Sequence, residues 1–324
     1  MIYRNLGSSG LRVSAIGLGS WLTYGRSVDD GVAHGCLTRA YELGVNFFDT
    51  ANVYGAGEAE RTLGRWLADL PRSDLVVATK VFFPMGEGPN DRGLSRKHIM
   101  EQCEASLRRL GLEYVDLYQC HRFDPSVPLE ETLRALDDLV TQGKVLYTGV
   151  SEWPAEALED AARIGRELGL RPLVSNQPQY SLLARGIEEA VIPLSMEHGI
   201  GQVVWSPLAG GALTGKYRPG RAAPEGSRGA DSTSNMFMGN VLEGDVLEAV
   251  ARLEREVATP MGITVAQLSL AWILRQPGIA SAIVGATRIG QVEENVAAAE
   301  IELDAETLER IEAIIGPFGM RNQL

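Results

Sequence analysis

The chain has 324 residues, of which 45% are apolar and 22% are charged, and its formal net charge is −12. These proportions are close to those of ordinary globular proteins, and the length allows a large hydrophobic core. The acidic balance argues against a general nucleic-acid-binding protein, which carries a basic face, although a local basic pocket for a phosphate remains compatible with it.

The sequence lacks the features of a targeting or membrane segment. Its first ten residues, MIYRNLGSSG, contain no apolar signal core, and no run of about 18 apolar residues follows. The three cysteines, Cys36, Cys103 and Cys120, are widely spaced and odd in number, so no disulfide framework or zinc spacing is visible. We therefore expect a cytoplasmic protein without a membrane span.

The predicted elements begin with a hairpin and continue as a regular alternation of strands and helices. Residues 3–6 and 11–14 form strand-like arms around a Gly-Ser-Ser-Gly turn. Most of the short apolar runs that follow are rich in β-branched or aromatic residues and lack strict alternation, as expected of strands buried on both faces. These runs lie at 15–19, 46–49, 75–80, 115–121, 144–150, 173–177, 202–206 and 281–285.

Amphipathic segments separate nearly all of these strands. In residues 97–110 the apolar side chains fall on one helical stripe, with Ser95 as the N-cap and Gly111 as the C-terminal stop. Residues 129–142 and 155–168 repeat the pattern, and a glycine follows each. Eight such units predict an α/β fold, a closed (β/α)8 TIM barrel with the hairpin as a plug and a long loop at 207–240. We expect a single domain over residues 1–324; a doubly wound open sheet is the structural alternative.

Polar groups stand at the ends of three successive predicted strands. Asp49, Lys80 and His121 end the second, third and fourth strand, and Tyr54 lies in the loop after Asp49. Because reactive groups of such barrels sit at the C-terminal ends of the strands, we expect these side chains on one rim. Each alone would be ordinary, as a turn aspartate, a solvated lysine or a structural histidine, but their occurrence together favours a catalytic site.

Their chemistry suits the reduction of a carbonyl group. The ordinary pKa of a tyrosine, about 10, is too high for efficient proton exchange at neutral pH, and we expect the Lys80 cation to lower the pKa of Tyr54. Asp49 would hold Lys80 in place, and a neutral His121 would donate a hydrogen bond to the carbonyl oxygen. Tyr54 would then protonate that oxygen as a hydride arrives at the carbon.

The motifs around these residues resemble those of the aldo-keto reductases, and in particular the branch with the potassium-channel beta subunits and their bacterial reductase relatives. The resemblance covers nearly the whole chain and rests on FFDTANVYGAGEAERTLG, VVATK, DLYQCHRFD, GKVLYTGVSEW, WSPLAGGALTGKY and AIVGATRIGQVEENVAAAE. It implies that Asp49, Tyr54, Lys80 and His121 form the family's catalytic tetrad, with Tyr54 as the acid–base residue. It also implies an NADPH-dependent reductase of aldehydes and ketones.

The resemblance further implies where a nicotinamide cofactor binds, which is needed because no side chain supplies a hydride. Ser151 and Gln177 match positions that hold the carboxamide, and Trp205 matches the ring on which the nicotinamide stacks. The start of the last barrel helix is placed to receive a phosphate. The other predicted cofactor contacts are Ser20, Trp21, Asp49, Ser206, Pro207, Leu208, Ala209, Gly210, Lys216, Ser227, Arg228, Gly285, Thr287, Arg288, Gln291, Glu294 and Asn295.

Two residues depart from the family pattern. Glu152 follows the serine of the Gly-x-Ser motif, where asparagine or arginine is frequent, and we leave it out of the predicted site. Gln291 stands where many members place an arginine for the 2′-phosphate, although the channel-subunit branch also has glutamine there. Arg228 and Arg288 offer positive charge for that phosphate, so NADPH is the predicted cofactor and NADH is the alternative.

Other motifs are weaker guides. GLGSWL (17–22) and GAGEAE (55–60) lack the third glycine of a Rossmann fingerprint, which favours tight turns over phosphate loops. GVSEW (149–153) lacks the last glycine of a serine-hydrolase nucleophile elbow. His121 and Asp124 could bind a metal, but the four histidines form no metal-binding spacing, which disfavours a metal-dependent barrel hydrolase.

Aromatic residues near the rim are candidates for a substrate pocket, although each could equally be a core or loop anchor. The candidates for the wall around a carbonyl substrate are Trp21, Tyr24, Tyr54, Phe82, His121, Trp153 and Tyr180. The expected partner is a small carbonyl compound, with a homo-oligomer as a further option and neither nucleic acid nor a metal. A cofactor-binding accessory protein with little turnover is the second candidate function.

Overall fold

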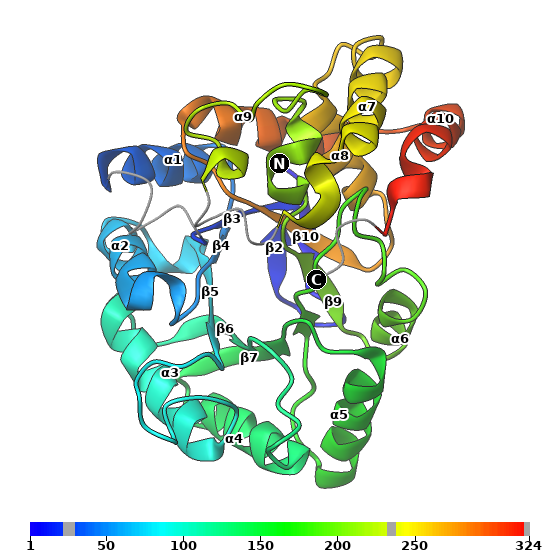
Figure 1. Ribbon diagram of the computed structural model, residues 1–324. Coiled ribbons are helices and arrows are strands. Elements are labelled where there is room, and N and C mark those ends of the chain that lie inside the picture. Colours follow the sequence, from blue (N-terminus) through cyan, green and yellow to red (C-terminus); the bar gives the residue numbers. More distant parts are fainter. Residues whose placement is uncertain (22–29, 232–237, 321–324) are drawn as a thin grey trace.

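The computed structural model describes residues 1–21, 30–231 and 238–320, and its strands form a closed parallel barrel (Figure 1). Neighbouring strands follow sequence order around the ring, and the last strand closes onto the first. This confirms the predicted barrel over the open-sheet alternative. The barrel strands are β3 (Ile16–Gly19), β4 (Phe47–Asp49), β5 (Val76–Val81), β6 (Val115–Cys120), β7 (Val145–Val150), β8 (Ser175–Asn176), β9 (Gly201–Val204) and β10 (Ile279–Val284).

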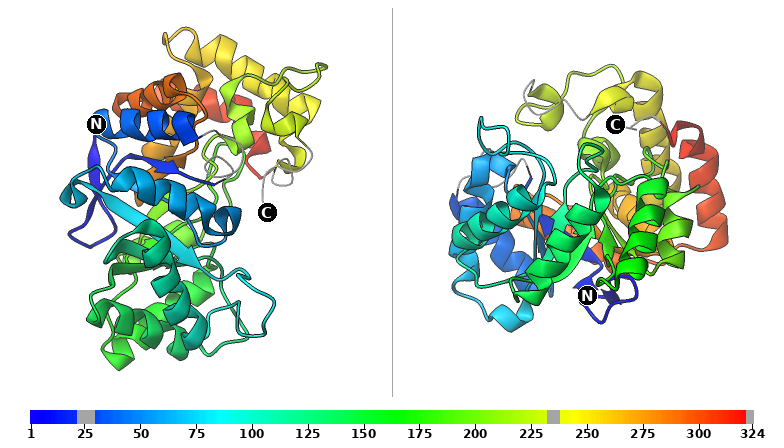
Figure 2. Two further views of the ribbon diagram at one scale, coloured as in Figure 1. Left: turned by 90° about the vertical axis from the view of Figure 1, so that its left-hand side faces the viewer. Right: turned by 90° about the horizontal axis from the view of Figure 1, so that it is seen from below.

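Helices surround this ring, as the views in Figures 1 and 2 show. They are α1 (Asp30–Glu42), α2 (Glu58–Leu67), α3 (Arg96–Leu110), α4 (Leu129–Thr141), α5 (Ala155–Leu168), α6 (Val191–Glu197), α7 (Gly244–Leu253), α8 (Val265–Leu274), α9 (Ile289–Ala297) and α10 (Ala305–Ile315). The predicted ends of α3 hold: Ser95 accepts the backbone N–H of His98, and Gly111 follows in the left-handed conformation. None of the helices in the described part of the chain is long and apolar enough to cross a membrane.

Two hydrophobic layers stabilise the barrel. The inner layer fills the ring and includes Phe47, Leu117 and Val203 from three strands. The outer layer, between strands and helices, includes Phe48 and Tyr118, the sequence neighbours of two inner residues. Strands such as β5 and β6 are therefore buried along their whole length, which explains their lack of polar alternation.

The N-terminal hairpin closes one end of the barrel. Its strands, β1 (Tyr3–Asn5) and β2 (Arg12–Ser14), pair antiparallel, and Leu6 and Val13 join the inner hydrophobic layer. The backbone N–H of Ser8 donates to the carbonyl of Gly199, just before β9 begins. The hairpin thus covers the N-terminal ends of the strands and leaves the opposite rim free for a site.

Gly7 provides a test of this arrangement. Its φ is +58°, and a Cβ there would stand 2.1 Å from the carbonyl oxygen of Gly199. Strain and collision together should make Gly7→Ala lower the thermal unfolding midpoint by about 5 °C or more. Gly10→Ala, in the same turn but with open space around it, is the matched control. Equal midpoints for both variants in circular dichroism melts would contradict the described seating of the hairpin.

Candidate active site

Four polar residues from successive strand ends meet at the open rim of the barrel. Asp49 ends β4, Lys80 lies near the end of β5, His121 follows β6, and Tyr54 begins the short helix η1 (Tyr54–Gly57). Lys80 Nζ donates to Asp49 Oδ1 over 2.5 Å. The hydroxyl oxygen of Tyr54 lies 3.4 Å from Lys80 Nζ and 3.4 Å from His121 Nε2. The structure therefore brings all four predicted catalytic residues into one cluster.

The ion pair of this cluster is buried. Lys80 has no exposed surface, and 4% of Asp49 is exposed. Such a pair survives the loss of hydration only with further hydrogen bonds, and both partners have them. Lys80 Nζ also donates to the carbonyl oxygen of Thr50 over 2.8 Å, and the Gln177 side-chain amide donates to Asp49 Oδ2 over 2.9 Å. Contacts from β4, β5 and the end of β8 thus hold the pair in one geometry.

The expected net lowering of the Tyr54 pKa is wrong. Burial, followed by the negative charge of Asp49, raises the pKa of Tyr54 well above its ordinary value, and Arg122 opposes this only in part. Lys80 cannot dominate because its charge is already matched by Asp49 at 2.5 Å. Tyr54 consequently stays a protonated phenol at neutral pH, which is the form that can donate a proton.

His121 is held neutral. Burial, then the cations Lys80 and Arg122, lower the pKa of His121 well below its ordinary value. Two neighbours that the sequence analysis did not select surround it: the Phe83 ring lies 4.9 Å from its ring centroid, and Arg122 donates to its carbonyl oxygen. In the sequence, only their closeness to predicted site residues could have identified them: Arg122 follows His121 directly, and Phe83 comes three residues after Lys80.

The glycine-rich segment after Asp49 shapes the turn that carries Tyr54. Gly55, Ala56 and Gly57 all have positive φ values, and a Cβ on Gly57 would stand 2.6 Å from Cδ of Arg109. Beneath this turn the fully buried Glu60 accepts hydrogen bonds from Thr79, beside Lys80, and from Arg109 of α3. These contacts support the interpretation of GAGEAE as a tight turn.

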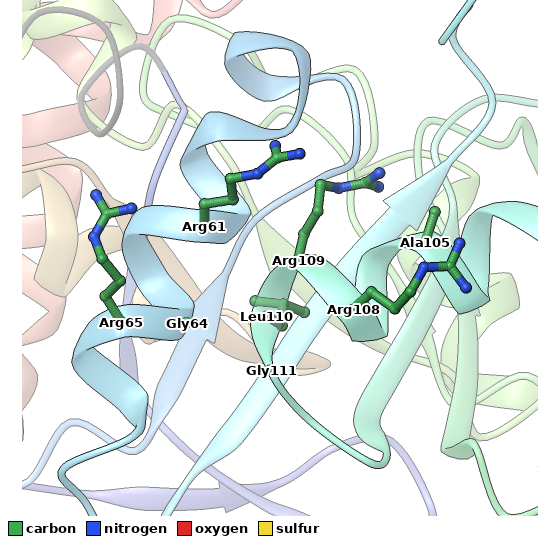
Figure 3. A pocket seen from close by; sticks show the side chains of 8 residues that line it. All are labelled: Arg61, Gly64, Arg65, Ala105, Arg108, Arg109, Leu110 and Gly111. Carbon is green, nitrogen blue, oxygen red and sulfur yellow. The ribbon is translucent and has the colours of Figure 1, made fainter.

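Arg109 also lines a hollow of about 600 Å³ between α2 and α3 on the outside of the barrel (Figure 3). Its other arginines are Arg61, Arg65 and Arg108, and the side chain of Arg65 extends away from the other three. Arg61, Arg65 and Arg109 are each paired with an acidic side chain. Because three of the four arginines are already paired with carboxylates, we do not assign an anion site to this hollow.

The predicted nicotinamide residues adjoin the tetrad. Trp21 lies with its ring centroid 6.4 Å from that of Tyr54 and, edge to face, 5.8 Å from that of Trp205. Ser20 donates to the Thr50 hydroxyl. The Ser151 hydroxyl donates to the carbonyl of Gln177, which leaves its lone pairs available as acceptors. The structure therefore joins these predicted residues to one rim.

The segment after β9 is conformationally strained. Ser206 and Ala209 are non-glycine residues with φ values of +53° and +47°, and Gly210 and Gly211 follow with positive φ as well. Pro207 is buried and Leu208 half-buried in the same segment. Strain of this kind clusters at ligand clamps and active sites. Lys216 folds back over this turn, since a Cβ on Gly211 would stand 2.7 Å from its Nζ.

Arg228 and Ser227 lie farther along the same long loop. The guanidinium carbon of Arg228 is 5.5 Å from the ring centroid of Trp21, and burial lowers the pKa of Arg228. Within the described residues no carboxylate forms an ion pair with it. The neighbouring Ser227 hydroxyl is buried without a hydrogen-bond partner there. A buried arginine without an ion pair and a buried hydroxyl without a hydrogen-bond partner are suited to an anionic ligand.

The residues predicted for the adenosine end form a second group, beyond β10. Gly285, Thr287, Arg288, Glu294 and the buried Asn295 lie before or within the first turns of α9. In the described chain their side-chain contacts stay within this region: the Gln291 side chain accepts from both the backbone and hydroxyl of Thr287. The start of α9 is exposed, and the N-terminus of a helix favours an anion.

The predicted substrate wall needs correction. Trp153 and Tyr180 belong to the outer hydrophobic layer, where Trp153 packs on Phe123 and the Tyr180 hydroxyl donates to Glu188. They are core anchors and do not form an accessible wall. Phe82 is half-buried and packs edge to face on Phe83, which is the ring beside His121. Tyr24 lies outside the described residues.

Glu152, which the sequence analysis left out, is part of the rim. Its carboxylate accepts the indole N–H of Trp205 over 2.6 Å. No signal in the sequence links these two residues, because they end different strands and lie 53 positions apart.

The described residues offer no metal site. The ranges 1–21, 30–231 and 238–320 contain no group of three or more His, Cys, Asp or Glu side chains that could hold an ion.

Comparisons with known proteins agree with this arrangement. A model of the aldo/keto reductase family matches residues 15–316. Proteins named "Probable voltage-gated potassium channel subunit beta" from Arabidopsis thaliana and Oryza sativa subsp. japonica are 43% and 42% identical over 320 residues, which are 97% of this chain and 97% of each relative. A "Putative voltage-gated potassium channel subunit beta" from Schizosaccharomyces pombe is 45% identical over 323 residues, 97% of this chain and 93% of the relative. The chain therefore belongs to the aldo/keto reductase family, in the branch that includes relatives named as potassium-channel beta subunits.

Proposed function

We propose that the protein is an NADPH-dependent oxidoreductase that reduces aldehydes and ketones to alcohols. The observation that carries this proposal is the position of the Tyr54 hydroxyl, which stays protonated and lies 3.4 Å from both Lys80 and His121. Family membership makes an oxidoreductase of this kind the expected class. A proton donor beside a neutral imidazole and a buried cation suits the reduction of a carbonyl group.

Each member of the tetrad has a distinct task in this proposal. The neutral imidazole of His121 donates a hydrogen bond that orients the carbonyl oxygen. Tyr54 gives its hydroxyl proton to that oxygen, and Lys80 stabilises the resulting phenolate from 3.4 Å. Asp49 keeps Lys80 charged and in place. The nicotinamide cofactor, when bound, supplies the hydride.

The rim offers groups that fit such a cofactor. Ser151 and Gln177 retain acceptor oxygens for the carboxamide, and the Trp205 indole provides a face for the ring. The strained segment 206–211, Lys216, the unpartnered Ser227 hydroxyl and the Arg228 cation suit the pyrophosphate. Thr287, Arg288, Gln291, Glu294 and Asn295 would receive the adenosine end.

The tyrosine provides the direct test of the mechanism. Tyr54→Phe removes the proton donor and little else, so we expect carbonyl reduction to fall by about 10²- to 10⁴-fold. NADPH binding should persist, because the cofactor groups are untouched. The rate is measured from absorbance at 340 nm with an activated aromatic aldehyde, and binding by fluorescence titration. Tyr3→Phe, on the hairpin at the other end of the barrel, is the control. A near wild-type kcat in Tyr54→Phe would refute the assigned role.

Arg288 tests the cofactor preference. This exposed residue is the N-cap of α9, where positive charge would grip the 2′-phosphate that distinguishes NADPH from NADH. We expect Arg288→Gln to weaken NADPH binding about tenfold and to leave NADH binding nearly unchanged. Arg108→Gln, an equal charge change on the exposed outer face of α3, is the control. A wild-type protein that binds NADH ten times more tightly than NADPH would contradict the proposed cofactor.

An accessory role is the second candidate function, and the names of the relatives favour it. Three relatives with 42–45% identity are named as potassium-channel beta subunits. In that case the protein would bind NADPH tightly, assemble with a partner and show little turnover. A panel of aldehydes, ketones and quinones distinguishes the two: no turnover with any of them, despite tight NADPH binding, would favour the accessory role.

The setting of the protein is also a proposal. Cys36, Cys103 and Cys120 are all free and buried, which is in keeping with a reducing cytoplasm. We further propose a single domain, because the barrel closes on itself and the hairpin seals one end. A homo-oligomer is proposed from the channel-subunit relatives alone.

A further inference from the structure

Glu152 occupies a constrained position at the end of β7, beside Trp205. Its Oε1 atom accepts two hydrogen bonds of 2.6 Å, from the indole N–H of Trp205 and from the backbone N–H of Gln179. Its backbone N–H donates to the carbonyl of Gln177, and its φ is +55°, in the left-handed region that non-glycine residues rarely adopt. The carboxylate is therefore held against the indole edge by both backbone and side-chain contacts.

The charge of Glu152 is not neutralised by these contacts. Both donors are neutral N–H groups, and among the described residues no lysine, arginine or histidine pairs with it, whereas Asp49 is paired with Lys80. The side chain is half-buried, so water screens it only in part. An unpaired negative charge thus lies at one edge of the proposed nicotinamide platform.

We propose that Glu152 biases the cofactor site toward the oxidised nicotinamide, in addition to orienting the indole of Trp205. The inference rests on the proposed function, and it concerns how that site discriminates between two forms of one ligand. The oxidised nicotinamide ring carries a positive charge, whereas the reduced ring is neutral. A carboxylate at the edge of the stacking indole attracts only the charged form, which lowers the free energy of the oxidised complex relative to the reduced one.

This bias would act on the direction of the reaction. Preferential binding of the oxidised form favours, by thermodynamic linkage, the side of the bound equilibrium on which the carbonyl compound has already been reduced. Glu152 touches neither the tetrad nor the carbonyl substrate in this scheme. It is a positioning residue that works through Trp205 and through its charge.

The test compares the dissociation constants of NADP⁺ and NADPH, measured by quenching of protein fluorescence. Glu152→Gln keeps an oxygen that can accept both hydrogen bonds and removes the charge. We expect it to raise the ratio of the NADP⁺ constant to the NADPH constant about tenfold, as expected for a partly screened unit charge. Glu156→Gln, the same chemical change at an exposed position on α5, should leave the ratio unchanged.

Glu152→Ala removes both the charge and the acceptor. This variant should raise the ratio similarly and also weaken the binding of both cofactor forms, because the indole loses its hydrogen-bond acceptor. Either variant is sufficient for the test, provided that it folds. A purely structural role would weaken both forms equally, so a ratio within twofold of wild type in the folded variants would overturn the inference while the proposed function stands. A wild-type protein that binds neither form would overturn the proposed function and this inference with it.

Discussion

The arrangement of the rim depends on one buried ion pair, between Lys80 and Asp49. A charged pair with almost no exposed surface is costly to dehydrate, and it persists because each partner has a further hydrogen bond, Lys80 to the carbonyl after β4 and Asp49 from the side chain of Gln177 after β8. The pair fixes the ends of β4 and β5 relative to each other. It also places a cation with an already balanced charge beside Tyr54, so that burial and the negative charge of Asp49 raise the pKa of Tyr54 and keep it protonated.

Tyr54 and the segment after Trp205 lie outside the strands, but contacts with the barrel hold both of them in place. The turn that carries Tyr54 lies above Glu60, which is bound from one side by Thr79 and from the other by Arg109. The segment after β9 is held in strained conformations directly after Trp205. In both places the barrel strands provide a rigid support, and the irregular backbone above them directs the side chains toward the open rim.

Much of the fold could be predicted because its signals are local. Eight apolar runs, helical stripes and terminating glycines such as Gly111 each depend on a few neighbouring residues, and these predictions were confirmed. The side-chain environment was harder to predict. Trp153 and Tyr180 carry no mark in the sequence that separates a core anchor from a pocket wall. The pKa of Tyr54 was predicted in the wrong direction, because burial and the pairing of Lys80 are properties of the assembled rim.

The sequence by itself determined that a parallel barrel would form and that Asp49, Lys80 and His121 would end consecutive strands, because periodicity and strand order require only local information. The family followed from motifs that lie in order along the chain. Only the tertiary structure decided how those ends meet. It left Tyr54 protonated, and it joined Glu152 to Trp205 across 53 positions of sequence. Distances, burial and the balance of neighbouring charges arise only when the ring closes.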